Sequence, residues 1–181
     1  DNDLPYRALE LAKDGHIAAE GWELIEIVDT SNDGSKCEMK MFAVDRMELE
    51  RRANKGDPSA CNELGASYLE GAVGYPVDYS KAVAWFKKAA DLKSADGLNN
   101  LAICYRNGQG VERNTNKAIE LLNKAIKLEH AEAAVTLGAM YFHGEGITQS
   151  VSNAVSLWEK AAALGSANAL FNFGQLYAAG V

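Results

Sequence analysis

The sequence predicts an all-α fold, an α-solenoid of stacked helix–turn–helix repeats, and three recurring patterns support this prediction. A leucine or phenylalanine followed four residues later by a tyrosine recurs in steps of 37, 36 and 36 residues, at Leu64, Leu101, Leu137 and Phe173. A lysine or asparagine followed by an alanine recurs in the same phase, at Lys81, Lys117 and Asn153. A glycine also recurs in register, at Gly71, Gly108, Gly144 and Gly180. Self-similarity at a fixed period of this length is the signature of a repeat array.

The composition is that of an ordinary globular protein. The chain has 181 residues, of which 48% are hydrophobic and 24% charged, so it can bury a core and is not predicted to be disordered. Its formal net charge of −7 disfavours unaided binding to nucleic acid or to an anionic membrane surface. No apolar run approaches the ~20 residues that cross a bilayer, so membrane insertion is not expected.

Residues 1–56 are less regular, and we interpret them as a divergent N-terminal repeat or cap. A helix is expected near 5–13, followed by a helical stripe that starts at Ile17, a turn at 31–35 and a long second helix that starts at Cys37. The alternative is a β-hairpin within 22–44, with strands 22–30 and 36–44 joined by the same turn. The β-branched residues Ile25, Ile27 and Val28 favour this alternative. We prefer the helical interpretation, and the hairpin stays open.

The regular part divides into repeats at 57–93, 94–129 and 130–165, followed at 166–181 by the first helix of an incomplete fourth repeat. The first helices are predicted at about 59–70, 96–107, 132–143 and 168–179. Leu64 and Tyr68 are four residues apart and therefore share one helix face, while the adjacent Gly65 allows a neighbouring helix to approach closely. Gly71 follows the last helical residue, where a left-handed helix stop is common. The second helices begin near 79, 116 and 152.

These residues resemble the Sel-one-like repeat (SLR) family, whose α-solenoids are related to tetratricopeptide repeats. The family pattern has Leu-Gly and Tyr in the first helix, then a Gly-x-Gly-Val turn, as in Gly108-Gln109-Gly110-Val111. It continues with Lys-Ala and an aromatic-rich helix that ends in Lys-Ala-Ala, as in Lys88-Ala89-Ala90. The match covers about 57–181, and it implies a right-handed superhelix. Two departures are an extra residue in the turn at 71–77 and Ala102 in the place of the family glycine.

The sequence gives little support for catalysis or metal binding. His16, His130 and His143 are far apart, and none has a ligand-type partner three or four residues away. The Gly-x-Gly turns at 108–110 and 144–146 join two helices, whereas a phosphate-binding loop joins a strand to a helix. Acidic neighbours dilute the basic pairs at 51–52 and 87–88, so neither predicts a nucleic-acid surface. We predict no catalytic, cofactor-binding or metal-binding residues and no enzyme activity.

The three cysteines carry limited information about the compartment. Cys61 and Cys104 fall in mostly apolar columns of the repeat alignment and are predicted to lie in the core, while Cys37 is in the irregular region. They lack C-x-x-C spacing and the paired cysteines of some secreted relatives. This favours a reducing, cytoplasmic compartment and leaves a periplasmic or secreted location open.

The resemblance implies that the first helix of each repeat lines a concave groove. Columns of the repeat alignment on this face vary from repeat to repeat, whereas the equivalents of Leu64, Gly65 and Tyr68 are nearly constant. Core positions are constrained by packing, so the variable columns are the candidates for partner binding. They combine polar with apolar side chains, as protein-binding surfaces do. The predicted groove residues are Asn62, Leu69, Glu70, Asn99, Ile103, Arg106, Asn107, Val135, Phe142, His143, Phe171 and Gln175.

The predicted function is therefore a non-catalytic adaptor or scaffold that presents this groove to a protein or peptide. One alternative, implied by the resemblance, is an immunity protein. Some bacterial members of the family resemble immunity proteins that bind and neutralise a toxin effector. A β-lactam-binding enzyme is another, since some cysteine-rich members have been associated with β-lactams, although no serine–lysine motif is visible here. A further expectation is end-to-end self-association through the incomplete repeat at 166–181.

Overall fold

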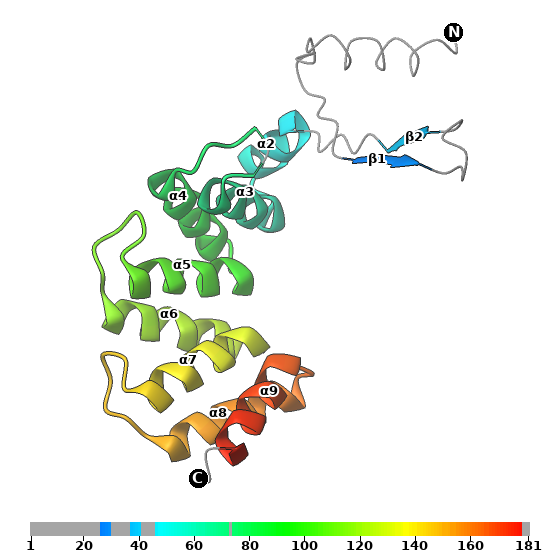
Figure 1. Ribbon diagram of the computed structural model, residues 1–181. Helices are drawn as coiled ribbons and strands as arrows, with labels where there is room; N and C mark the ends of the chain where they lie inside the picture. The colour runs from blue at the N-terminus through cyan, green and yellow to red at the C-terminus, as the bar shows by residue number, and fades with distance from the viewer. Residues whose placement is uncertain (1–25, 30–36, 41–45, 73, 179–181) are drawn as a thin grey trace, which may run out of the picture. The chain divides into compact units, whose positions relative to one another are not determined.

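The computed structural model describes residues 26–29, 37–40, 46–72 and 74–178, and the chain divides into two compact units, 1–51 and 52–181 (Figure 1). The first unit holds a two-stranded antiparallel sheet of β1 (Glu26–Asp29) and β2 (Cys37–Lys40). Glu26 lies opposite Lys40, and Asp29 lies opposite Cys37. The turn predicted at 31–35 lies outside the described residues.

The hairpin corrects our preferred helical interpretation of this region, which is wrong over both strands. A short apolar run bounded by turn residues fits a helix stripe and a strand almost equally well, and here the β-branched Ile27 and Val28 lie in β1. The predicted second helix is found only farther along the chain, as α2 (Arg46–Asn54). The helix expected near 5–13 lies outside the described residues.

The second unit contains the predicted helical hairpins. Its helices are α3 (Pro58–Glu70), α4 (Tyr79–Asp91), α5 (Ala95–Asn107), α6 (Thr115–Lys127), α7 (Ala131–His143), α8 (Val151–Ala163) and α9 (Ala167–Ala178). Helix α3 packs on α4, α5 on α6 and α7 on α8, and each pair packs on the next through α4 and α5, α6 and α7, and α8 and α9. This arrangement confirms the predicted helical solenoid. Its core contains the repeated leucines Leu64, Leu101 and Leu137, which are 1%, 5% and 2% exposed.

Polar side chains cap the helix starts at the same repeat positions. Asp57, Ser94 and His130 accept hydrogen bonds from backbone N–H groups in the first turns of α3, α5 and α7. Asp78, Asn114 and Ser150 do the same for α4, α6 and α8. Each cap satisfies a donor that has no partner within the helix. The caps explain why every helix of the array starts at a fixed place in the period.

The two glycines of each Gly-x-Gly turn have different structural roles. The first ends the helix in the left-handed conformation, with φ of 73° at Gly108 and 69° at Gly144, and Gly71 does the same, with φ of 74°, in the turn that has an extra residue. The second, Gly146, also has positive φ, and a Cβ atom there would lie 2.6 Å from Cγ2 of Thr115 in the preceding repeat. The turn therefore needs glycine both for its backbone conformation and for close packing between repeats.

The sizes of facing side chains in the two helices of a hairpin explain why the Leu-Gly pair recurs between repeats. A Cβ atom on Gly65 would lie 2.6 Å from ring carbons of the fully buried Phe86, and one on Gly138 would meet the indole of Trp158. In the middle repeat Ala102 replaces the glycine, and the position equivalent to Phe86 is the smaller Leu122. The middle repeat therefore has a larger side chain on the first helix and a smaller one on the second. The two changes compensate each other in volume, as a close-packed core requires.

Candidate functional site: the first-helix face

The first helices form a continuous surface in the second unit. Helix α3 contacts α5 and α7 contacts α9, whereas no described pair of consecutive second helices makes contact of that extent (Figure 1). Side-chain hydrogen bonds join α5 to the repeat of α7, from Arg106 to Glu145 and between Asp96 and His130. The first helices therefore lie on the inner side of the turn of the array. All the predicted groove residues lie on these helices. We call the surface formed by these residues, without Asn99, the first-helix face.

Its apolar side chains are exposed to different degrees. Phe171 on α9 is 66% exposed, next to Leu170, which is 63% exposed. Ile103 is half-buried, while Leu69 and Val135 are half-buried and pack partly on the core. The face thus offers isolated apolar contacts along α3, α5, α7 and α9. The predicted self-association through the last helix stays a prediction.

Aromatic packing holds Phe142 at the C-terminal end of α7. Its ring centroid lies 5.6 Å from that of the buried Trp158 and 5.1 Å from that of the exposed His143. Trp158 is in turn anchored by its indole N–H, which donates to the carbonyl of Val135 at 3.2 Å. Phe142 is therefore partly buried, and it packs between the core residue Trp158 and the exposed His143.

Arg106 is engaged within the array. Its guanidinium donates to both carboxylate oxygens of Glu145, in the turn after α7, at 2.6 and 2.9 Å. The hydrogen bonds from Arg106 lower the pKa of Glu145 below its ordinary value. The two side chains are 29% and 31% exposed. This ion pair links two repeats. Because Glu145 neutralises the charge of Arg106, a polypeptide bound on this face would meet little net charge here.

Asn99 was predicted in the groove, and this prediction is wrong. Its side chain is only 7% exposed, because α5 packs against α3, α4 and α6. Its Oδ1 atom has no hydrogen-bond partner among the described residues. The equivalent Asn62 is half-buried, and its Oδ1 accepts from Asn100 Nδ2 at 2.9 Å. Equivalent repeat positions thus differ in burial because the helices that cover them differ.

Several polar residues that link the first helices are not among the predicted groove residues. Asp96 Oδ1 lies 2.9 Å from His130 Nε2, and His130 Nδ1 accepts from the backbone N–H of Ala133. Glu132 accepts from Ser166 at 2.7 Å and from Asn168 at 2.9 Å. In each pair a carboxylate is followed by a hydrogen-bond donor 34 or 36 residues later, which is about one repeat. This spacing is present in the sequence and could have indicated the contacts.

Among the described residues we looked for metal-binding groups and for reactive cysteine nucleophiles. No described group of three or more histidine, cysteine or acidic side chains is placed to hold a metal ion. Cys61 and Cys104 are fully buried, as predicted for core residues. Burial raises the pKa of both thiols, that of Cys104 to about 11. Because the thiolate is the reactive form of cysteine, both side chains are poor nucleophiles. Within the described ranges, no helix has the length and apolarity needed to span a bilayer.

Together, the stacked hairpins define a helical repeat protein of the solenoid class. More particularly, the chain belongs to the Sel1 repeat family, because the Sel1 repeat matches residues 58–94, 95–130 and 131–166. Membership supports a protein-interaction or scaffold module as the class of function. Proteins of this fold are typically non-catalytic.

The chain is similar to curated proteins from two frogs. It is 36% identical over 85 residues to cytochrome c oxidase assembly factor 7A of Xenopus laevis and 34% identical over 85 residues to cytochrome c oxidase assembly factor 7 of Xenopus tropicalis. Each match covers 46% of this chain and 37% of the relative. The aligned part is therefore little more than a third of either relative.

Solved bacterial structures share the fold. A Sel1 repeat protein from Oxalobacter formigenes matches with a TM-score of 0.63 and 26% identity, over 75% of this chain and 61% of that one. The protective antigen c5321 of uropathogenic Escherichia coli, which has an SLR fold, matches with a TM-score of 0.66 and 30% identity, over 75% and 29% of the two chains. Cysteine-rich protein B of Helicobacter pylori matches with a TM-score of 0.54 and 27% identity, over 68% and 92%.

Proposed function

We propose that the chain is a non-catalytic adaptor that binds a polypeptide partner on its first-helix face. The observation that carries this proposal is that the exposed and half-buried side chains on the first helices differ from repeat to repeat. Buried positions such as Leu64 and Leu101 repeat because they pack on their neighbours. The surface positions are free of that constraint and can be matched to one partner.

The exposed chemistry suggests how a partner is held. Phe171, Ile103 and Val135 supply apolar contacts, and burial of apolar surface is the dominant favourable term in most protein–protein association. Asn107 and Gln175 are exposed amides that can donate to and accept from a peptide backbone. Arg106 is paired with Glu145, so the proposed interface depends little on clamping a free carboxylate.

The relatives support a protein as the partner. The two frog proteins are named as assembly factors of cytochrome c oxidase, and they match 46% of this chain. Together with the Sel1 repeats, these names favour an action on other polypeptides over an action on a small-molecule substrate.

Site-specific photocrosslinking tests the proposal. A photoreactive amino acid is placed at Phe171 or Gln175 on the first-helix face and, as a control, at the exposed Asn123 or Glu159 on second helices. In cells that express the chain, the first-helix probes should crosslink to a common polypeptide, identified by mass spectrometry. Crosslinking of that polypeptide equally from all four positions would contradict the proposed face.

The binding contribution of the face can then be measured with the identified polypeptide. Phe171→Ser removes the most exposed ring of the face, and it should weaken binding by about tenfold if that ring is covered by the partner. Leu164→Ser removes an exposed leucine at the end of α8, and it should leave binding unchanged. Equal effects of the two variants would refute the assignment.

A further inference from the structure

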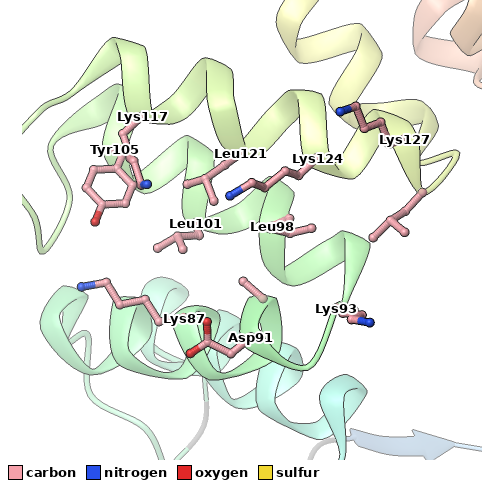
Figure 2. Close-up of a pocket in the computed structure, with 12 residues that line it drawn as sticks. Lys87, Asp91, Lys93, Leu98, Leu101, Tyr105, Lys117, Leu121, Lys124 and Lys127 are labelled. Carbon is pink, nitrogen blue, oxygen red and sulfur yellow. The ribbon is translucent and has the colours of Figure 1, made fainter.

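A second concave surface lies between the second helices α4 and α6. It is a cleft of about 510 Å³ whose floor comes from α5 (Figure 2). Leu98 and Leu101 of α5 and Leu121 of α6, which are only 6%, 5% and 5% exposed, form an apolar base, and Leu128 also lines the cleft. Leu128 is 47% exposed, although it is a large apolar side chain. The accessible apolar surface of the recess therefore comes mainly from Leu128, which lies beside the small exposed parts of the base leucines.

The rim of this lysine cleft is strongly basic. Lys87 on α4, Lys93 after α4 and Lys117, Lys124 and Lys127 on α6 line it, against the single acid Asp91. In Figure 2 the α4 and α6 lysines stand on opposite sides of the leucine floor. The chain as a whole has 25 acidic and 18 basic residues, so five lysines around one recess run against its charge balance.

Most of this positive charge is not neutralised within the array. Lys117 and Lys124 share the carboxylate of Glu120 at 3.1 and 2.7 Å. Lys87, Lys93 and Lys127 form no ion pair with a carboxylate of the described residues. Like charges that face one recess repel one another, and an anionic occupant would relieve this repulsion.

The lysine cleft is separate from the first-helix face. Leu98, Leu101 and Tyr105 of α5 point to the cleft, whereas Ile103 and Arg106 belong to the first-helix face. At 3.6 residues per turn, the mean directions of these two sets differ by about 140° around α5, so they lie on different faces of the helix. An occupant of the cleft would therefore leave the first-helix face free.

We propose that the lysine cleft binds an acidic amphipathic helix of another polypeptide. The helix lies between α4 and α6, with its apolar stripe on the leucines and its carboxylates beside the lysines of both rims. This is the geometry in which an amphipathic helix enters a groove. The opposite charges favour an acidic over a basic helix and make binding sensitive to salt.

The shape of the cleft favours a helix over two other anionic partners. Single-stranded nucleic acid is bound on stacking aromatic platforms, and Tyr105 is the one aromatic residue among those that line the cleft. Interfacial membrane binding inserts a protruding apolar face into the lipid, whereas these leucines form the base of a recess. A helix can place its side chains into the recess from above.

The test uses the full chain and a synthetic probe of defined composition. The probe is a fluorescein-labelled peptide of about 13 residues, the length of α4 and α6, with leucines at i, i+3, i+4 and i+7 and glutamates elsewhere. We expect saturable binding by fluorescence anisotropy, weakened by salt. A scrambled peptide of the same composition and a version with lysine in place of glutamate should bind at least about tenfold more weakly.

Matched variants locate the site. Lys87→Glu with Lys127→Glu should weaken binding of the acidic probe by at least about tenfold. The control, Lys55→Glu with Lys160→Glu, changes exposed lysines elsewhere and lowers the net charge of −7 by the same 4 units. Leu128→Ser should weaken binding about threefold. Leu164→Ser changes the equivalent, 40% exposed leucine of the next repeat and should have no effect.

Other outcomes would overturn the proposal. Equal losses in the cleft and control variants would show non-specific charge attraction, and scrambled and amphipathic probes that bind alike would exclude a helix. Binding to phosphatidylglycerol vesicles or oligo(dT) that requires Lys87 and Lys127, without binding of the peptide, would assign the cleft to lipid or nucleic acid. The crosslinking pattern of the first-helix face does not depend on Lys87 or Lys127, so the two proposals fail separately.

Discussion

The size match between Gly65 and Phe86 predicts a strong coupling between the two positions. In Gly65→Ala the new methyl group would lie 2.6 Å from the ring of a side chain that is 0% exposed and cannot move into solvent. Overpacking of this kind costs up to about 3 kcal/mol. The gain in helix propensity from Gly to Ala offsets about 1 kcal/mol. We expect a net loss of about 2 kcal/mol in the free energy of unfolding.

Phe86→Leu should also destabilise the chain when it is made alone. It removes three carbon atoms from a fully buried side chain, which costs about 2 kcal/mol at roughly 0.8 kcal/mol for each buried carbon group. The double variant, in contrast, reproduces the natural pair of the next repeat, Ala102 with Leu122. We expect it to lose only about 1 kcal/mol, which leaves a coupling of about 3 kcal/mol between the two sites.

Urea unfolding followed by circular dichroism measures the four free energies of this cycle. Gly174→Ala is the matched control, because Gly174 has the same repeat position in α9 and a Cβ atom there meets nothing within 4 Å. It should keep or raise stability by about 1 kcal/mol through helix propensity alone. Single losses that add to within about 0.5 kcal/mol in the double variant would refute the size-match argument.

Three further predictions concern polar and titratable groups. His130→Ser should keep the cap of α7, since Ser94 caps α5 at the equivalent position, and should lose only the contact with Asp96, whereas His130→Ala also loses the cap and should be less stable than His130→Ser by about 1 kcal/mol in urea unfolding. Iodoacetamide at mildly alkaline pH should alkylate Cys104 only as fast as the chain unfolds, because burial raises the pKa of that thiol to about 11; rapid labelling seen by mass spectrometry would contradict its placement. Hydrogen bonds from Arg106 lower the pKa of Glu145, so their ion pair should contribute about 0.2 to 1 kcal/mol above the ordinary glutamate pKa, and this contribution should be lost as the pH falls through the lowered value. The stability difference between the wild type and Glu145→Gln should therefore vanish in acid.

The helical array was predictable because its signals are local and repeated. Turn glycines such as Gly108 and cap residues such as Asn114 act within a few residues of themselves, and each occurs again one period later. The hairpin of the first unit was not preferred because its run of apolar residues is short and occurs once. There, β1 and β2 pair with each other, and that pairing is not visible in the periodicity of either segment.

The two candidate surfaces differ in the same way. The first-helix face follows from the repeat register, although Asn99 shows that burial of an individual side chain depends on the helices around it. The lysine cleft could not be predicted, because Lys87 and Lys127 are 40 residues apart and belong to different repeats. Only the packing of α4, α5 and α6 places their charges around one recess.

The sequence by itself therefore determined the repeat length, the helix ends and the residues of the core, because capping, turn geometry and periodic burial are properties of neighbouring residues. The tertiary structure decided which polar groups pair between repeats, which groove candidates are covered and where the lysines gather. Those features depend on distances between helices that are far apart in the chain, and these distances exist only once the hairpins are stacked.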